Sequence, residues 1–249
     1  MAISLLDLSS PDRIIEFINT HPLPPVTVPQ SLLTTSSLPD DFDAAVVGSS
    51  LMSFARGLLP QQRKDLSMCN LYAQQTACMK DYAPQLDWFE RYKQLLLAFG
   101  TAEAETLEVR RPAPGSGMRD EVQSVIAQAG EEYGELTRRA LASLEDDRPA
   151  QVLFEQESKY SEGSQFQVLP CTGEEEGVVN IALYHREFIY EPETPWWWWG
   201  GKKAQLTGLK ERLCVVPFRI DFFEGYRPHL QARVKDHIQS KIALLDIGS

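Results

Sequence analysis

The feature that most constrains the fold is a change in hydrophobic periodicity near Pro149. Before this residue, apolar side chains recur at three- and four-residue steps, as on one face of an α-helix. After it they alternate, as on one face of a β-strand. Helices followed by alternating segments are typical of the α+β class, in which helices pack on an antiparallel sheet. We therefore predict N-terminal helices followed by an antiparallel β-meander and a C-terminal helix.

Several amphipathic segments precede the change. A short helix is expected from Ser10, with Pro11 in its first turn and apolar residues turned toward a partner surface, namely Ile14, Phe17 and Ile18. A proline-rich arm covering residues 20–39 should follow it. Residues 43–99 favour three helices, separated by turn residues at 57–60 and 82–85. The middle one is apolar around much of its circumference, which predicts a central position.

Two further helices have clear spacing. The third helix of the 43–99 region spaces its large side chains by four, three and four residues: Trp88, Tyr92, Leu95 and Phe99. The longest should extend from Met118 to Leu144. Before it, the prolines and glycines of residues 110–118 form the strongest linker signal in the chain. This linker separates an N-terminal arm and helical region, 1–110, from a region 111–249, and we expect the two to fold as one unit.

The alternating part predicts strands. Their inner faces would carry Val152 and Phe154, then Phe166 and Val168, followed by a long strand over residues 177–191 and another over 214–222. Pro217 cannot donate to a strand ladder, so it favours an edge or a bulge. A C-terminal helix with Leu230, Val234 and Ile238 on one side, and a short strand at 243–247, would end the fold.

Net charge excludes one class of ligand. The 249 residues carry a formal charge of −11, whereas nucleic acid is held chiefly by Lys and Arg, so we predict no nucleic-acid partner. The first residues lack a basic leader, and no stretch has the roughly 18 apolar residues of a spanning helix, which predicts a cytoplasmic location.

Motifs for metals and cofactors are incomplete. The four cysteines are too scattered for a metal site, and the acidic residues at 40, 41 and 43 lack the glycine and glutamate of a calcium loop. Gly48, Ser49 and Ser50 match neither a phosphate-binding loop nor a nucleophile elbow, and favour close backbone packing. We predict no metal and no cofactor, and an enzyme is the less favoured class. His185 is interpreted as a surface residue.

The most unusual segment carries four consecutive tryptophans: Trp196, Trp197, Trp198 and Trp199, followed by two glycines and then Lys202 and Lys203. Successive residues of a strand point to opposite faces, so four adjacent indoles cannot all serve one core. Tryptophan favours interfaces where one side is dry and the other wet. Two of the indoles could instead lie beneath a covering helix, so the segment is either an interaction surface or part of the core.

Three functions follow from these residues. The first is a non-enzymatic interaction protein that presents the Trp-rich segment to a protein partner or to a second copy of itself. The alternative is a membrane-active or toxin-like protein whose Trp-rich tip contacts a membrane surface. The third is an enzyme, which would need a cluster assembled from distant residues such as His185, Glu187, Arg219 and Asp221.

Three segments carry a family resemblance: AVVGSSLMSFARGLLPQQRKDLSMCNLYAQQTAC, then DWFERYKQLLLAFG, and finally QARVKDHIQSKIALLDI. Together they resemble an uncharacterised family of microbial α+β proteins, in which a Val-Gly-Ser turn precedes a helix containing Asn, Leu, Ala and Gln and an aromatic helix follows. The resemblance implies one co-linear unit with N-terminal helices and a β-rich latter part. It brings no activity, because the shared residues are packing residues.

Overall fold

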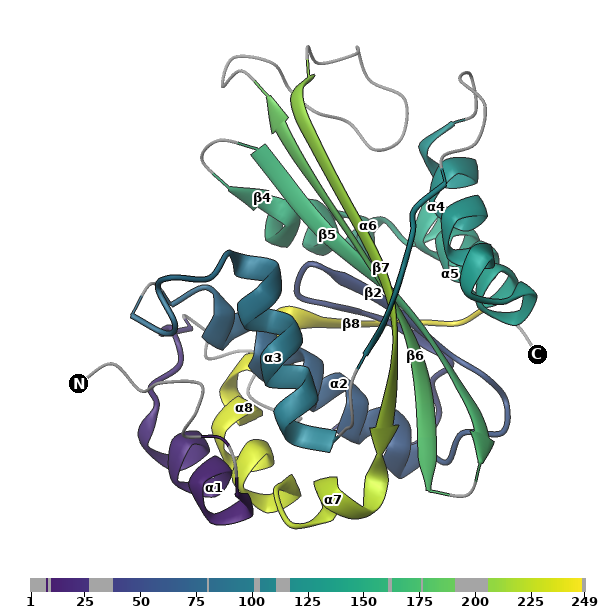
Figure 1. Cartoon of the computed structure of the whole chain (residues 1–249). Coiled ribbons are helices and arrows are strands. Elements are labelled where there is room, and N and C mark those ends of the chain that lie inside the picture. Colours follow the sequence, from purple (N-terminus) through teal and green to yellow (C-terminus); the bar gives the residue numbers. More distant parts are fainter. Residues whose placement is uncertain are drawn as a thin grey trace.

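The structure is a computed structural model that describes residues 8, 10–26, 38–79, 81–100, 104–110, 117–160, 163–175, 177–190 and 206–247. One sheet forms its centre, and helices cover both faces (Figure 1). The predicted α+β class, with helices first and a helix near the end, is confirmed.

The sheet is built around a meander of three long antiparallel strands. These are β5 (Gly163–Glu175), β6 (Val178–Tyr190) and β7 (Leu206–Arg219). Next to β5 lie β2 (Ser50–Phe54), which pairs with it in parallel, then β1 (Ala44–Val47) and β8 (Ile242–Leu245). Two short strands complete it, β3 (Glu105–Leu107) beside β7 and β4 (Lys159–Tyr160) beside β5. Strands from both sides of the linker at 110–118 therefore share one sheet.

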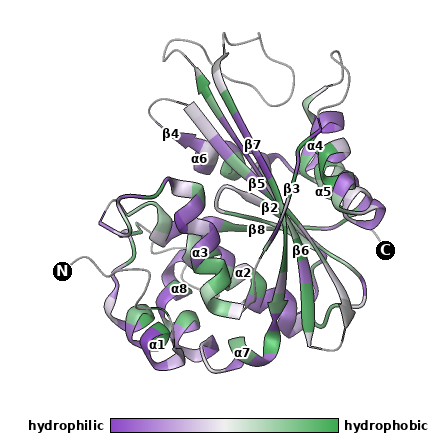
Figure 2. Cartoon of the chain, in the orientation of Figure 1, coloured by the Kyte–Doolittle hydropathy of each residue, from purple (hydrophilic) through white to green (hydrophobic). Residues whose placement is uncertain are grey.

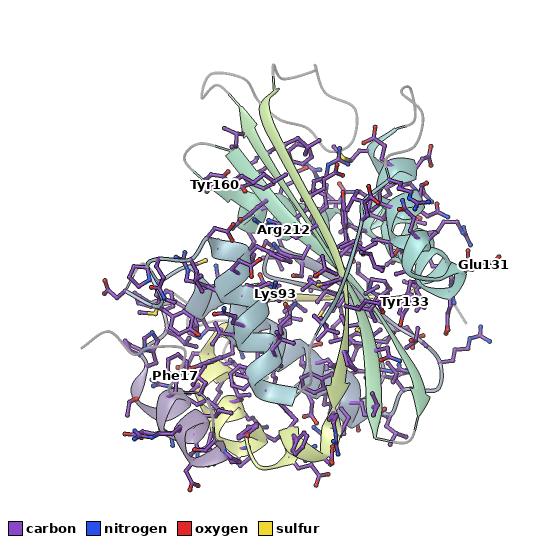
Figure 3. All side chains as sticks on the ribbon, in the orientation of Figure 1. Phe17, Lys93, Glu131, Tyr133, Tyr160 and Arg212 are labelled. Atoms are coloured by element: carbon purple, nitrogen blue, oxygen red, sulfur yellow. The ribbon has the colours of Figure 1, made fainter. Side chains whose placement is uncertain are left out.

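Each face of the sheet carries its own helices and core. The first face, here called the α3 face, packs against α1 (Pro11–Thr20), α2 (Pro60–Ala77), α3 (Trp88–Gly100), α7 (Ile220–Glu224) and α8 (Arg227–Lys241). The second, the α5 face, packs against α4 (Met118–Ile126), α5 (Glu131–Asp146) and α6 (Arg148–Ser158). Figure 3 places Lys93 and Arg212 on the side of α3, and Tyr133 and Glu131 on the side of α5. The sheet is buried on both faces at its centre, in β1, β2 and the middle of β5 and β6.

Helical periodicity identified most of the α3-face helices. Ser10 caps α1 by accepting a hydrogen bond from the Arg13 N–H at 3.4 Å, and the three apolar residues expected to face inward are buried. α2 is buried on nearly all sides, as its circumference of apolar residues predicted. Tyr92, Leu95 and Phe99 of α3 are buried. These predictions are confirmed.

The first helix predicted within residues 43–99 is wrong, because this segment forms the β1–β2 hairpin. Gly48 occupies its turn with a φ of 56°, a left-handed conformation that glycine adopts without strain. Both strands lie inside the sheet and are buried on both faces, so their apolar runs do not alternate. Periodicity alone does not separate such a run from a buried helix.

Two predictions around α5 are also wrong. The single helix expected from Met118 to Leu144 is α4, a 3₁₀ turn (Ala127–Ala129) and α5, divided at Gly130, whose φ is 152°. The strand expected at Val152 and Phe154 is α6, which buries Phe154. Asp147 caps α6 by accepting from the Ala150 N–H at 2.9 Å, and a proline follows in its first turn. These helix-start signals outweigh the two-residue alternation.

The strand predicted over residues 214–222 begins and ends earlier than expected, because β7 spans Leu206–Arg219. β3 pairs with only three of its residues, 213–215, so Pro217 lies beyond the described pairing on that side, in agreement with an edge position. The hydropathy colouring in Figure 2 shows apolar segments in the lower part of β7 and a hydrophilic stretch above it, where Lys210, Glu211 and Arg212 follow one another. That stretch leads to the polar site below.

Candidate functional site

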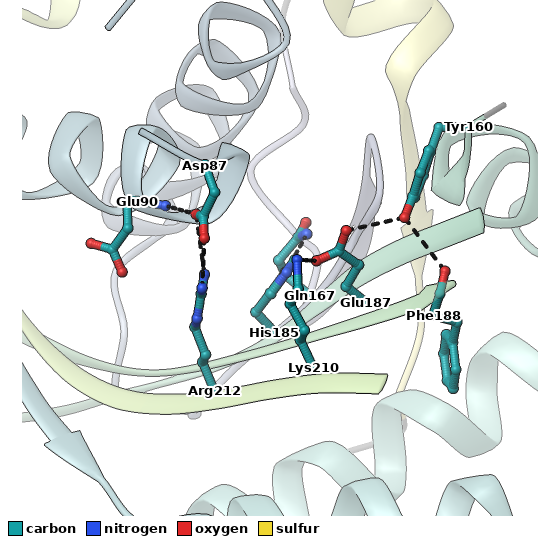
Figure 4. A network of polar contacts seen from close by, with 9 residues as sticks. All are labelled: Asp87, Glu90, Tyr160, Gln167, His185, Glu187, Phe188, Lys210 and Arg212. Atoms are coloured by element: carbon teal, nitrogen blue, oxygen red, sulfur yellow. Dashed lines mark hydrogen bonds and ion pairs between the residues drawn. The ribbon is translucent and has the colours of Figure 1, made fainter. Parts of the chain in front are cut away.

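Polar side chains form two cross-strand rows on the α3 face of the meander. The register aligns Gln167 of β5 with His185 of β6 and Arg212 of β7, and we call this the inner row. The outer row, two residues nearer the strand ends, aligns Gln165, Glu187 and Lys210. Figure 4 shows the inner row, and Glu187 and Lys210 of the outer row, beside the start of α3. Side chains in such rows touch because directly opposed residues point to the same face.

His185 is the buried centre of the inner row. Only 1% of its surface is exposed, and its ring stacks on Phe89 and Trp88 of α3 at centroid distances of 4.8 and 5.7 Å. Its Nδ1 lies 3.2 Å from Nε2 of Gln167, an arrangement in which the amide donates to a neutral imidazole. Burial, reinforced by the charge of Arg212, lowers the pKa of His185 to about 3. The prediction that His185 is a surface residue is therefore wrong.

An ion pair closes the inner row at the surface. Arg212 donates two hydrogen bonds to the Asp87 carboxylate, at 2.6 and 3.2 Å, and its guanidinium lies 4.8 Å above the Phe89 ring. Asp87 also accepts from the Glu90 N–H at 2.9 Å, which caps the start of α3. Although partial burial acts in the opposite direction, these bonds lower the pKa of Asp87 to about 2. The pair fixes the first turn of α3 over His185.

The outer row is more open. Lys210 Nζ lies 3.0 Å from Oε2 of Glu187, and the Tyr160 hydroxyl donates to Oε1 of the same carboxylate at 3.1 Å. Tyr160 and Lys210 are exposed, while Glu187 is half-buried. The tyrosine fits against β6 because Gly163 leaves space there: a Cβ at Gly163 would lie 2.7 Å from the Tyr160 hydroxyl oxygen. An aromatic ring and two charges thus lie side by side at the surface.

Behind the inner row, a buried amide network connects the sheet to α2. Gln167 Oε1 lies 3.0 Å from the hydroxyls of both Ser49 and Ser50. Gln74 of α2 accepts from the Ser49 N–H at 2.9 Å and donates to the Val47 carbonyl at 2.8 Å. The serines therefore hold the hairpin turn against α2, as the prediction of close packing at this turn implies. His185 contacts Gln167 and not the serines, so the arrangement is not that of an activated nucleophile.

The residues of the enzyme hypothesis fall into two groups. His185 and Glu187 share the α3 face of β6, whereas Arg219 pairs with Asp221 at 2.8 Å at the other end of β7. Arg219 lies seven residues from Arg212, which is about 23 Å along a strand. The four residues do not assemble into one cluster.

Two of the acidic residues at 40, 41 and 43 have structural partners. Asp43 accepts from Arg63 Nη1 at 2.6 Å, and Asp40 pairs with Lys64. Among the described residues, no group of three or more His, Cys, Asp or Glu side chains is placed to hold a metal ion. Nor does any helix of the described part have the length and apolar character needed to cross a membrane.

The predicted interaction residues, Trp196, Trp197, Trp198, Trp199, Lys202 and Lys203, lie outside the described residues. The structure does describe the strands on either side of them. β6 ends at Tyr190, β7 begins at Leu206, and these two residues are register partners. The two described residues that flank the segment 191–205 therefore lie beside one another at the upper end of the meander (Figure 1).

Sequence reasoning missed most of the polar rows. It identified His185 and Glu187 as candidates but not Gln167, Lys210 or Arg212. A signal was present, because the alternation of Cys214, Val216 and Phe218 continues backward through Arg212 and Lys210. Extending that pattern would have placed both basic residues on the same face as the core.

Comparison with models of protein families, with curated proteins and with solved structures finds no significant match to this chain.

Proposed function

We propose that this protein is a non-enzymatic interaction protein in which the β6–β7 hairpin presents the Trp-rich segment 191–205 to a protein partner. The observation that carries the proposal is the register pair of Tyr190 and Leu206. It makes the segment a connection between two long, fixed strands. A segment attached in this way can expose large side chains while its base stays in place, which reduces the entropy lost on binding.

Burial along β6 supports the same position. On the α3 face, Val179, Ile181, Leu183 and His185 are buried, whereas Glu187 and Ile189 are only half-buried. The helices of that face therefore cover the lower part of the strand and leave its upper part partly open. Exposed aromatic residues beside charged ones are typical of binding surfaces, in which Trp, Tyr and Arg contribute most of the energy. The proposed surface combines the tryptophans with Tyr160 and Lys210.

The composition of the segment favours a protein partner. Four adjacent indoles present two pairs to opposite sides if the segment is extended, so one pair can pack on a partner while the other packs on the sheet. The net charge of −11 repels anionic lipids and weakens the membrane alternative. Lys202 and Lys203 give the segment a local positive charge that would favour an acidic partner surface.

A photo-crosslinking amino acid at position 198 tests the proposal. We expect crosslinked adducts, either to a second copy or to a defined partner, that disappear when the other three tryptophans are changed to serine. The matched control carries the crosslinker at Phe222, an exposed aromatic residue close to the other end of β7. Adducts of equal yield from both positions would contradict the proposal.

Two solution measurements complete the test. Light scattering after size-exclusion chromatography separates self-association from binding to another protein. It is applied to the wild type and to a variant with serine at all four tryptophan positions, 196–199. Flotation with vesicles of anionic and of neutral lipid, together with tryptophan fluorescence, tests the membrane alternative. Flotation with a blue shift of the emission would overturn the proposal in favour of membrane contact.

A further inference from the structure

A small pocket lies between α2 and α8. Figure 1 shows these two helices on the part of the molecule opposite the tip of the meander. Its volume is about 110 Å³. Leu38 and residues of both helices form its walls: Gln61, Lys64 and Met68 of α2, and Arg227, Gln231 and Ile238 of α8. Within each helix these residues are three, four or seven positions apart, so they lie on one side of the helix.

The floor of the pocket is apolar. Leu38, Met68 and Ile238 are each buried, with no more than 7% of their surface exposed. A ligand that reaches them must therefore carry an apolar part. A cavity of about 150 Å³ holds one benzene ring, so this pocket holds about four or five non-hydrogen atoms.

Two ion-paired cations, Lys64 and Arg227, line the mouth of the pocket. Lys64 pairs with Asp40, whose side chain is 84% exposed, so water solvates that carboxylate and it can leave at small cost. Arg227 donates through Nε and Nη2 to the buried carboxylate of Asp65, at 2.7 to 3.0 Å. Within the described part of the chain its Nη1 makes no hydrogen bond. Both cations thus retain donors for a ligand.

Asp65 explains why Arg227 lies where it does. The Asp65 side chain is fully buried, and it also accepts from Gln61 Nε2 at 2.7 Å. A buried carboxylate needs a paired cation, so the guanidinium is held at the mouth in a fixed orientation while a quarter of its side chain remains exposed. A fixed planar guanidinium is the preferred partner of a carboxylate.

We propose that this pocket binds a short-chain carboxylate, with the hydrocarbon chain on Leu38, Met68 and Ile238 and the carboxylate between Lys64 and Arg227. The site does not depend on the proposed interaction function. Inorganic anions lack the apolar part that the floor requires, and an amine would add a third cation beside Lys64 and Arg227. The four-carbon chain of pentanoate matches this volume, with its carboxylate at the mouth.

The probe is pentanoate, added to the full-length, ¹⁵N-labelled protein and followed by amide chemical shifts. We expect saturable shifts in α2 and α8. Pentanamide, which has the same chain without the charge, should bind much more weakly, and acetate, which lacks the chain, should not bind. Equal binding of pentanoate and pentanamide, or no saturable shift with pentanoate, would overturn the proposal.

Two variants locate the site, and a third controls for charge. Lys64→Met should weaken pentanoate binding about fivefold or more, because it removes one charged donor at a partly exposed position. Gln231→Trp places an indole at the mouth and should abolish binding. Lys235→Met removes an exposed lysine of α8 that does not line the pocket and should leave the affinity unchanged. Circular dichroism confirms folding of each variant, and equal affinities for Lys64→Met and Lys235→Met would refute the site.

Discussion

Replacing Gln74 by leucine tests whether the buried amide network holds the hairpin turn against α2. Gln74 is 3% exposed, and its amide bonds both sides of the turn. Oε1 accepts from the Ser49 N–H at 2.9 Å, and Nε2 donates to the Val47 carbonyl at 2.8 Å and to Asn70 Oδ1 at 3.1 Å. Leucine has a similar volume, so the substitution removes the hydrogen bonds and leaves little empty space.

The expected cost follows from these bonds. The Ser49 N–H lies in the turn and would be left buried without an acceptor, which costs about 1–3 kcal/mol. The lost bonds to Val47 and Asn70 add about 0.5–1.5 kcal/mol each. The total is about 2–6 kcal/mol, a large share of the roughly 5–15 kcal/mol by which a domain is stable. Gln74→Leu should therefore rank among the most destabilising single changes in the chain.

Urea denaturation followed by tryptophan fluorescence measures the effect as a shift of the midpoint at constant slope. The matched control is Gln75→Leu, the same substitution at the next position of α2, which is half-buried and makes no side-chain hydrogen bond with the described residues. Its free energy of unfolding should change by no more than about 0.5 kcal/mol. If Gln74→Leu is destabilised no more than Gln75→Leu, the network does not hold the turn.

Three further predictions concern the core. Arg186→Met should lower the free energy of unfolding, measured in urea, by about 3–5 kcal/mol, because it leaves a buried carboxylate without its cation. The side chain of Glu211 is 4% exposed, and its Oε1 lies 3.6 Å from Nε of Arg186. A decrease of less than about 1 kcal/mol would contradict this prediction. His185 has a pKa of about 3 in the folded protein and takes up its proton mainly in the unfolded state, so the free energy of unfolding should fall as the pH drops from about 6.5 toward 3. His185→Phe should reduce the loss of stability between pH 6 and pH 4 by about 2 kcal/mol. An unchanged loss of stability in this variant would refute the buried neutral ring. Gly134→Ala would gain about 1 kcal/mol of helix propensity, but its Cβ would lie 2.8 Å from the Cβ of Ala127. Thermal denaturation should therefore show a net loss of stability, and adding Ala127→Gly should reverse it.

Periodicity predicted the elements that have one buried face and failed for those with two. α1 and α3 each bury one side, and the spacing of Ile14, Phe17 and Ile18 is visible in the sequence. β1 and β2 are buried on both faces, because α2 covers one side and α5 and α6 cover the other. Nothing in their sequence alternates, and small residues such as Ala44 and Ala45 suit a helix equally well. Only the pairing with β5 and β8 decides their structure.

The polar rows were partly predictable for a related reason. Glu187 and His185 are two residues apart on an expected strand, so their common face could be inferred from the sequence. Their partners Gln167 and Arg212 are 18 and 27 residues from His185, and the register that aligns them depends on the whole meander. The burial of His185 depends on α3, whose first turn is fixed by Asp87. A single sequence does not determine such a contact.

The two halves of β6 have separable roles, and this separation makes the proposed function open to a clean test. Its middle part, residues 181–186, is buried on both faces and joined through Gln167 to the network around Gln74. On the α3 face its last described side chains, Glu187 and Ile189, are half-buried, and the strand leads to the Trp-rich segment. Gln74→Leu should therefore lower stability without changing partner binding at temperatures well below unfolding. Serine at the four tryptophan positions should do the reverse. If both changes reduce stability and binding together, the tryptophans belong to the core, and the interaction function loses its support.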